Sequence, residues 1–181
     1  MKNTVFAGIA LLALASQSAR ADFVLTATLA GSNQVPPNSS MATGSAILTF
    51  LTQSQTIAYD VIYSGLTASA LEGHIHFGPY GSNGPIILPF VPGPTGTTGE
   101  VRGVLSAANL INQAASGINT YSDIVTAALA DNLYVNLHDS NYPAGEIRGQ
   151  VVPEPSSVVL VGMGLVGLVG YVTRTARRRV A

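Results

Sequence analysis

The stretch LYVNLHDSNYPAGEIRGQV, residues 133–151, contains two runs in which apolar and polar side chains alternate. Successive side chains of a β-strand point to opposite faces, so this alternation predicts two strands that each have one apolar and one polar face. The run DSNYPAG between them is rich in turn-forming residues, which favours a hairpin. One natural register of that hairpin places Asn136 opposite Arg148 and His138 opposite Glu146, so that the two polar faces coincide.

The same alternation recurs throughout residues 22–152 and predicts about eight short strands. They are DFVLTATL (22–29), SAILTFLT (45–52), TIAYDVIYS (56–64), GHIHF (73–77), PIILPF (85–90), EVRGVL (100–105), LYVNLH (133–138) and EIRGQVV (146–152). Loops rich in Gly, Pro, Ser and Asn separate them. The pattern predicts an all-β fold, an antiparallel β-sandwich or a Greek-key barrel. Of the two we expect a single antiparallel β-sandwich of Greek-key, immunoglobulin-like or superoxide-dismutase-like type.

One segment departs from the strand pattern. SDIVTAALADN, residues 122–132, has apolar residues at helical spacing. Ser122 is suited to cap the N-terminus of a helix, and Asp123 would lie in its first turn. We expect one short helix here, directly before the strand at 133–138.

Residues 1–21 have the features of a secretory signal peptide. A single positive charge, Lys2, precedes an apolar run, and the segment closes with the small-x-small sequence Ala19-Arg20-Ala21. The apolar run is too short to span a membrane stably as a helix. We expect export of the protein and cleavage between Ala21 and Asp22.

The C-terminus predicts a membrane span. Between Glu154 and Arg174 lie 19 residues without a charge, and a helix of that length spans roughly 28 Å, about one hydrocarbon core. We place this transmembrane helix at about 156–173. A basic tail follows, with Arg174, Arg177, Arg178 and Arg179. Because arginine clusters stay on the cytoplasmic side, the N-terminal part of the protein is expected outside.

The sequence Val152-Pro153-Glu154-Pro155-Ser156, the apolar helix and the arginine tail together resemble a PEP-CTERM protein-sorting signal at 153–181. The resemblance implies that an exosortase, a membrane-embedded cysteine protease, recognises Pro153, Glu154 and Pro155 and removes the tail. The protein would then be anchored in the inner membrane before processing, and at the cell surface or outside the cell afterwards. A plain single-span anchor is the alternative.

The composition of residues 22–152 excludes several classes of function. Two arginines and no lysine stand against eight acidic residues, a net charge of −6. Nucleic-acid binding needs a basic surface, so we expect no nucleic-acid partner. The chain has no cysteine, which excludes disulfides, thiolate catalysis and sulfur-ligated zinc. The length of this part suits a single domain.

Four segments of residues 22–152 occur in an order typical of one family. They are ATLAGSNQVPP, ALEGHIHFGP, GEVRG and the closing stretch LYVNLHDSNYPAGEIRGQV. Together they resemble a CHRD domain, the module repeated in chordin and found singly in many exported bacterial proteins. The resemblance implies an all-β extracellular module and no enzymatic reaction.

The chain has only three histidines, His74, His76 and His138, and each lies on the polar face of a predicted strand. We expect them to lie close together. Two alternatives follow. In the first, they form a hydrogen-bonded polar cluster that fixes strand register. In the second, they are the ligands of one copper or zinc ion. The residues expected around them, as structural partners or as partners of the ligands, are Asn136, Glu146 and Arg148.

A fragment with two histidines one residue apart, followed by a later histidine-bearing strand, is similar to copper–zinc superoxide dismutases. The similarity rests on His74, His76 and His138, with Gly145 and Arg148. Three histidines are too few for a bridging ligand and a full zinc set, so the fragment does not indicate dismutase activity. No G-x-S-x-G motif is present, which disfavours a serine hydrolase.

These features leave two functions open. We expect a non-catalytic binding or structural module, at the cell surface or in the exopolysaccharide matrix, with exopolysaccharide or surface proteins as partners. This function requires no cofactor. The alternative is a metal-binding protein that holds one copper or zinc ion through the three histidines, with a site similar to that of superoxide dismutases.

Overall fold

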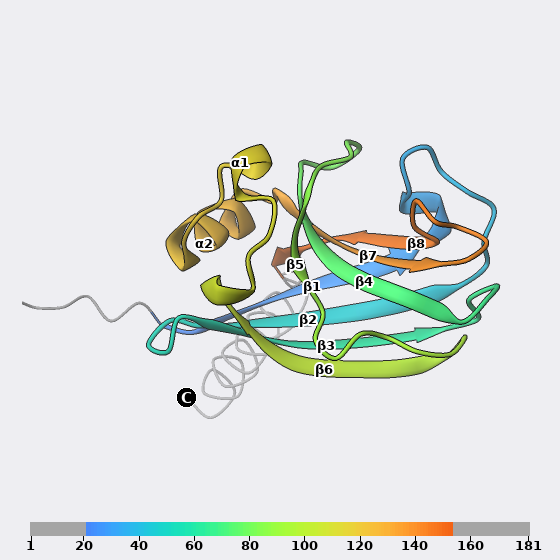
Figure 1. Cartoon of the computed structure of the whole chain (residues 1–181), viewed down its shortest axis with the longest axis horizontal. Helices are drawn as coiled ribbons and strands as arrows, with labels where there is room; N and C mark the ends of the chain where they lie inside the picture. The colour runs from blue at the N-terminus through green and yellow to red at the C-terminus, as the bar shows by residue number, and fades with distance from the viewer. Residues whose placement is uncertain (1–20, 154–181) are drawn as a thin grey trace, which may run out of the picture.

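The computed structural model describes residues 21–153, and its strands form one antiparallel sheet (Figure 1). The strands are β1 (Phe23–Ala30), β2 (Thr43–Leu51), β3 (Thr56–Ser64), β4 (Ala70–Phe77), β5 (Ile86–Pro89), β6 (Gly99–Ser106), β7 (Leu133–Asp139), β8 (Ile147–Gln150) and β9 (Val152–Pro153). Their order across the sheet is β5-β4-β7-β8-β1-β2-β3-β6, and β9 pairs with β1. All eight predicted strands are present.

The prediction of a sandwich is corrected by this topology. The sheet is continuous and curls into a nearly closed barrel, with β4, β7 and β8 above β1, β2, β3 and β6 (Figure 1). β1 joins the two halves, because it pairs with β2 along its whole length and with β8 at Ala30. Alternation in the sequence shows that one face of each strand is buried. It does not show whether two layers are separate sheets or one curled sheet.

The core fills the inside of this barrel with the apolar faces of the strands. Leu48, Ile57, Ile75 and Val135 are fully buried, one from each of four strands. Each such side chain contributes about 1.5–3 kcal/mol relative to an exposed position. The alternation that predicted the strands therefore also identified their inward faces.

Helical segments lie mainly at one end of the barrel (Figure 1). They are the 3-10 turns η1 (Gly31–Asn33) and η2 (Ala107–Asn109), and the α-helices α1 (Gln113–Ser116) and α2 (Tyr121–Leu129). α2 is the predicted helix. The additional helix α1 has four residues, too few to produce a periodic pattern.

The predicted cap of α2 is wrong by two residues. Thr120, not Ser122, is the N-cap: its hydroxyl accepts a hydrogen bond from the backbone N–H of Asp123, whose carboxylate accepts one from the backbone N–H of Thr120. This reciprocal arrangement satisfies two N–H groups. Both residue types favour caps, so the sequence alone did not distinguish them.

Three connections cover the outer face of β4, β7 and β8, where the polar residues lie. The segment after β1 reaches it through Gln34, which donates to Asn136 over 2.7 Å. The segment 78–85 contacts it through Gly84, and the loop between β7 and β8 through Pro143. As a result every residue of β7 is buried, including those on its polar side.

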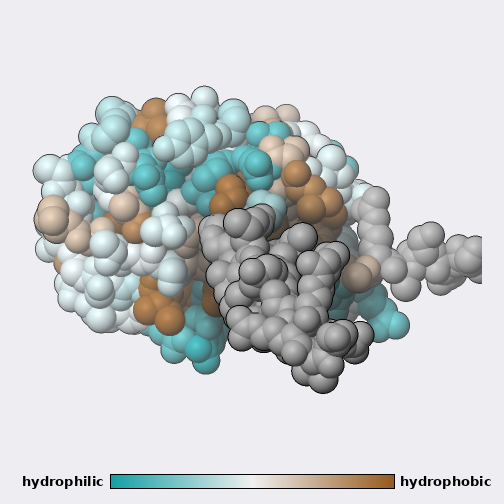
Figure 2. All heavy atoms as spheres, turned by 180° about the vertical axis from the view of Figure 1, so that it is seen from behind, coloured by the Kyte–Doolittle hydropathy of each residue, from teal (hydrophilic) through white to brown (hydrophobic). Residues whose placement is uncertain are grey.

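Several predictions lie outside the described residues. They concern the signal peptide before Ala21, the transmembrane helix at 156–173, Glu154 and Pro155 of the sorting motif, and the basic tail. Within residues 21–153, no helix is both long and apolar enough to cross a membrane. Seen from behind, the apolar side chains on the described surface form separate groups, not one continuous face (Figure 2).

Candidate metal centre

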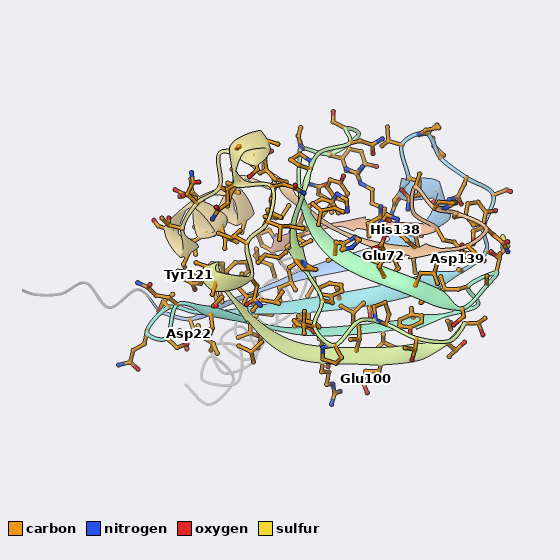
Figure 3. All side chains as sticks on the ribbon, in the orientation of Figure 1. Asp22, Glu72, Glu100, Tyr121, His138 and Asp139 are labelled. Atoms are coloured by element: carbon orange, nitrogen blue, oxygen red, sulfur yellow. The ribbon has the colours of Figure 1, made fainter. Side chains whose placement is uncertain are left out.

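β4 and β7 bring the three histidines together. The two strands are antiparallel neighbours, and their register pairs Glu72 with His138, His74 with Asn136, and His76 with Tyr134. His138 therefore lies diagonally across from His74, within reach of its side chain. In Figure 3, Glu72 and His138 lie side by side on this pair of strands.

The three rings form a compact buried group, which we call the histidine cluster. Ring centroids are 5.1 Å apart for His74 and His138, 5.7 Å for His74 and His76, and 6.1 Å for His76 and His138. One ring nitrogen from each residue lies within 4.8 Å of those of the other two. The residues are only 5–6% exposed.

Backbone carbonyls fix the tautomers of two of these rings. Nδ1 of His76 lies 3.0 Å from the carbonyl oxygen of Gly84, and Nδ1 of His138 lies 3.0 Å from that of Pro143. A carbonyl oxygen only accepts, so each Nδ1 carries the proton and donates it. Nε2 of each neutral ring is then left with a lone pair, and both Nε2 atoms are buried without a hydrogen-bond partner.

Glu72 has the same effect on His74. Its carboxylate lies 3.3 Å from Nε2 of His74, so Nε2 is the donating nitrogen and Nδ1 carries the lone pair. Nδ1 is buried and has no hydrogen-bond partner. Each ring thus offers one unprotonated nitrogen, and the proton of each is directed at an oxygen. Metal-binding histidines in proteins are commonly held in this way.

Burial disfavours protonation of two of the rings, those of His74 and His76. Burial lowers the pKa of His76 to about 4, and the hydrogen bond to Gly84 only partly offsets this effect. Burial, followed by the proximity of His138, also lowers the pKa of His74, although Glu72 acts in the opposite direction. Low pKa values keep the lone pairs available to a metal ion at the pH of most environments.

The dimensions of the cluster fit a single ion. A metal–imidazole bond is ~2 Å long, so nitrogens bound to one ion lie no more than ~4 Å apart, and the rings need to close by about 1 Å at most. Three imidazoles suit copper and zinc, whereas calcium and magnesium prefer oxygen ligands. The residues present therefore fit copper or zinc.

Tyr134 and Arg148 support the cluster from one side. The ring of Tyr134 stacks on His76 with centroids 4.6 Å apart, and the guanidinium carbon of Arg148 lies 3.5 Å above the centre of the Tyr134 ring. The hydroxyl of Tyr134 also contacts Nδ1 of His76 at 3.1 Å. Arg148 is opposite Asn136, in the predicted register.

Glu146 was expected beside His138, and here the structure differs. The register pairs Leu137 with Ile147 and ends there. The backbone N–H of Glu146 donates to the carbonyl of Leu137, not to that of His138. The carboxylate of Glu146 accepts hydrogen bonds from Ser40 and Thr67. Only His74 has a carboxylate partner, and it is Glu72. The loops that cover the strands supply these donors, and sequence spacing within a hairpin says nothing about them.

Glu146 instead forms a buried carboxyl pair with Asp139, the residue after His138. Both are fully buried. Burial, together with the adjacent Asp139, raises the pKa of Glu146. Burial alone would raise the pKa of Asp139 as well, but hydrogen bonds from Glu146 and from backbone N–H groups lower it overall. These opposite shifts mean that a proton bound by the pair is favoured on Glu146 over Asp139.

Sequence reasoning missed Glu72, Tyr134 and Gly84. Glu72 shares the strand parity of His74 and His76, and this signal was available. The sequence signal for Gly84 was weaker, since it was only the presence of a glycine. A side chain at this position would collide with the backbone of Phe77, so only glycine brings this carbonyl to His76.

Comparison with known proteins agrees with the sequence resemblances. A family model described as the CHRD domain matches residues 25–151, and a model described as the PEP-CTERM protein-sorting motif matches residues 151–179. The first match covers most of the chain and includes all three histidines. No curated protein and no solved structure matches the chain.

Proposed function

The chain belongs to the CHRD-domain family, and from this premise we propose that its domain is a non-catalytic metal-binding module. One copper or zinc ion would be held by His74, His76 and His138. The CHRD domain and the sorting motif together support an extracellular protein that an exosortase processes. We further propose that the processed protein lies at the cell surface or in the exopolysaccharide matrix. In either place the protein meets metal ions from outside the cell.

One observation carries the proposal: three buried ring nitrogens with lone pairs converge, and none has a hydrogen-bond donor. Buried polar atoms are normally paired, and leaving one unpaired costs about 1–3 kcal/mol. A cluster that served only to fix strand register would pair these nitrogens with donors. A cation satisfies all three at once.

The protons of the rings support the same function. Gly84, Pro143 and Glu72 each accept one, which fixes the orientation of each ring within the cluster. Such partners orient the ligand rings before a metal arrives. The site is therefore preorganised on two strands of the sheet, and the closing movement it needs is small.

Metal analysis of the protein purified without an affinity tag tests the proposal. We expect about one copper or zinc ion for each chain, retained through gel filtration or restored by adding the metal ion. His138→Gln should weaken binding by more than about 100-fold, because one of three ligands is lost.

Glu72→Gln and Glu100→Gln form a matched pair of variants. Both remove an acidic side chain that is exposed, but only Glu72 contacts a ring of the cluster. We expect about tenfold weaker binding for Glu72→Gln and unchanged binding for Glu100→Gln. Equal binding by the protein and His138→Gln would overturn the proposal, as would no binding by folded protein.

A further inference from the structure

We propose that the site selects a monovalent ion, Cu(I), over Zn(II) and Cu(II). This inference rests on the proposed metal-binding function and names its ligand. It follows from the charged groups around the histidine cluster: the buried cation Arg148, the exposed carboxylate Glu72, and Asp139, whose oxygens are held by hydrogen bonds.

The ligand set brings no negative charge to the ion. The three grouped ligand residues are all histidines, and an imidazole that binds a metal ion does so as the neutral ring. A divalent ion would keep its full double charge in a site whose residues are 5–6% exposed. Burying charge without compensation is costly, and the cost rises steeply with the charge on the ion.

Glu72 is the one carboxylate among the groups that shift the pKa of His74 and His76. Its side chain is 57% exposed, so water screens its charge. Asp139 follows His138 in the chain, but its oxygens accept hydrogen bonds from Thr67, Ala68 and other backbone N–H groups. Neither carboxylate supplies a ligand to the cluster.

Arg148 adds a positive charge on the other side. It is 2% exposed, and its guanidinium donates only to neutral oxygens, those of Asn83, Ser82 and Pro79. No carboxylate lies within ion-pair distance of it among residues 21–153. Its charge is therefore uncompensated, and only the Tyr134 ring separates it from His76.

The positive charge of Arg148 repels a bound ion, and the repulsion grows with the charge of that ion. We take the distance between the Arg148 charge and the ion as that across two stacked rings, roughly 8–10 Å. At the effective dielectric constant of a protein, Arg148 then lowers the binding affinity about tenfold for each unit of positive charge on the ion. The number of ligands points the same way. The cluster supplies three ligands, so Zn(II) would need a water molecule as a fourth ligand at this buried position, whereas Cu(I) would not.

Competition titrations of the purified protein test this selectivity. Cu(I) is measured anaerobically against bicinchoninate, and Zn(II) and Cu(II) against chelators of known affinity. We expect the dissociation constant for Cu(I) to be the lowest by at least about tenfold. We also expect bound copper to have a reduction potential above that of the aqueous ion.

Two variants change the electrostatic potential at the histidine cluster in opposite directions. Arg148→Gln removes the buried cation and should shift the ratio of Zn(II) to Cu(I) affinity about tenfold toward Zn(II). Glu72→Gln removes the screened carboxylate and should shift the ratio the other way by a smaller factor. Because Glu72 is exposed, this variant keeps the inference testable if Arg148→Gln fails to fold.

The outcomes separate the two proposals. If folded protein binds none of the three ions, the proposed metal-binding function fails and this inference fails with it. If Zn(II) or Cu(II) binds as tightly as Cu(I), the inference alone is overturned and the metal centre stands. A ratio that neither variant moves would also overturn the inference.

Discussion

Two buried polar groups lie next to each other on β7, and they differ in one respect. The histidine cluster leaves a lone pair on each ring without a partner, whereas every oxygen of the carboxyl pair Asp139 and Glu146 accepts a hydrogen bond. His138 and Asp139 are consecutive, and both are buried. Figure 3 shows both residues toward the same end of the barrel.

This difference in hydrogen bonding indicates that the carboxyl pair is the structural group. The carboxyl pair ties Ser40, Thr67 and Ala68 to the end of the sheet and needs nothing further. The donating nitrogens of the histidine cluster also have acceptors, Gly84, Pro143 and Glu72. The other nitrogen of each ring makes no hydrogen bond within the described residues. Burial alone does not distinguish the two groups, and hydrogen-bond satisfaction does.

The largest expected effect comes from the carboxyl pair. Asp139→Ala leaves the backbone N–H groups of Ala68, Asn141 and Tyr142 unpaired, and should lower the free energy of unfolding by about 3–4 kcal/mol. Chemical denaturation followed by circular dichroism measures it. Asp139→Asn keeps one accepting oxygen and should lose about half as much. A loss below about 1 kcal/mol for Asp139→Ala would remove the distinction between the groups.

The next effect belongs to the histidine cluster with metal present. Free metal ion at 100 times the dissociation constant should raise the free energy of unfolding by about 2.7 kcal/mol, since the ion binds the folded state. The same denaturation experiment in His138→Gln should show no increase, and Glu100→Gln should behave as the unchanged protein. Equal stabilisation of all three proteins would place the ion elsewhere.

Without metal, the cluster should matter little to stability. His74→Gln removes a ring whose Nδ1 has no partner and whose Nε2 contacts only the exposed Glu72. We expect a loss of less than about 1 kcal/mol in metal-free protein, since no buried donor is orphaned. The test is denaturation in the presence of a chelator. A loss as large as that of Asp139→Ala would make the cluster structural.

The smallest effect is a pH dependence of the carboxyl pair. The pKa of Glu146 is raised in the folded protein, so its contribution to stability is present below the ordinary value of 4.5 and is lost as the pH rises through the folded value. Glu146→Gln stays neutral at every pH. The difference in unfolding free energy between this variant and the unchanged protein should therefore shift in favour of the variant as the pH rises above 4.5.

Urea denaturation at a series of pH values measures this difference. The lowered pKa of Asp139 acts in the other direction, since its contribution is lost as the pH falls below the ordinary value of 3.8. Because Glu146 is one of the groups that lower this pKa, the two proteins are compared only above pH 4.5. A constant difference across the pH series would show that Glu146 does not hold the shared proton.

The local pattern of the sequence predicted much of the fold. All eight strands and α2 follow from alternation and helical spacing, and the pairing of Asn136 with Arg148 follows from the hairpin. The parity of His74, His76 and His138 correctly assigned them to the polar faces. These features depend on residues close together in the chain, where backbone geometry fixes the directions of side chains.

Contacts between distant segments decided the rest. Gln34 meets Asn136 across 102 positions, and Ser40 meets Glu146 across 106. Such contacts buried the polar face of β7, and alternation says nothing about the groups that cover a face. They also gave Glu146 partners other than His138.

The sequence by itself determined that the chain is a β domain of the CHRD family with a sorting motif, and that its three histidines face one way. Only the tertiary structure decided that one nitrogen of each ring is left without a donor, and that the buried Arg148 nearby has no carboxylate at ion-pair distance among residues 21–153. The physical reason is that alternation fixes the face of a strand on which a side chain lies. Which groups cover that face, and whether they donate or accept, depends on loops that come from elsewhere in the chain.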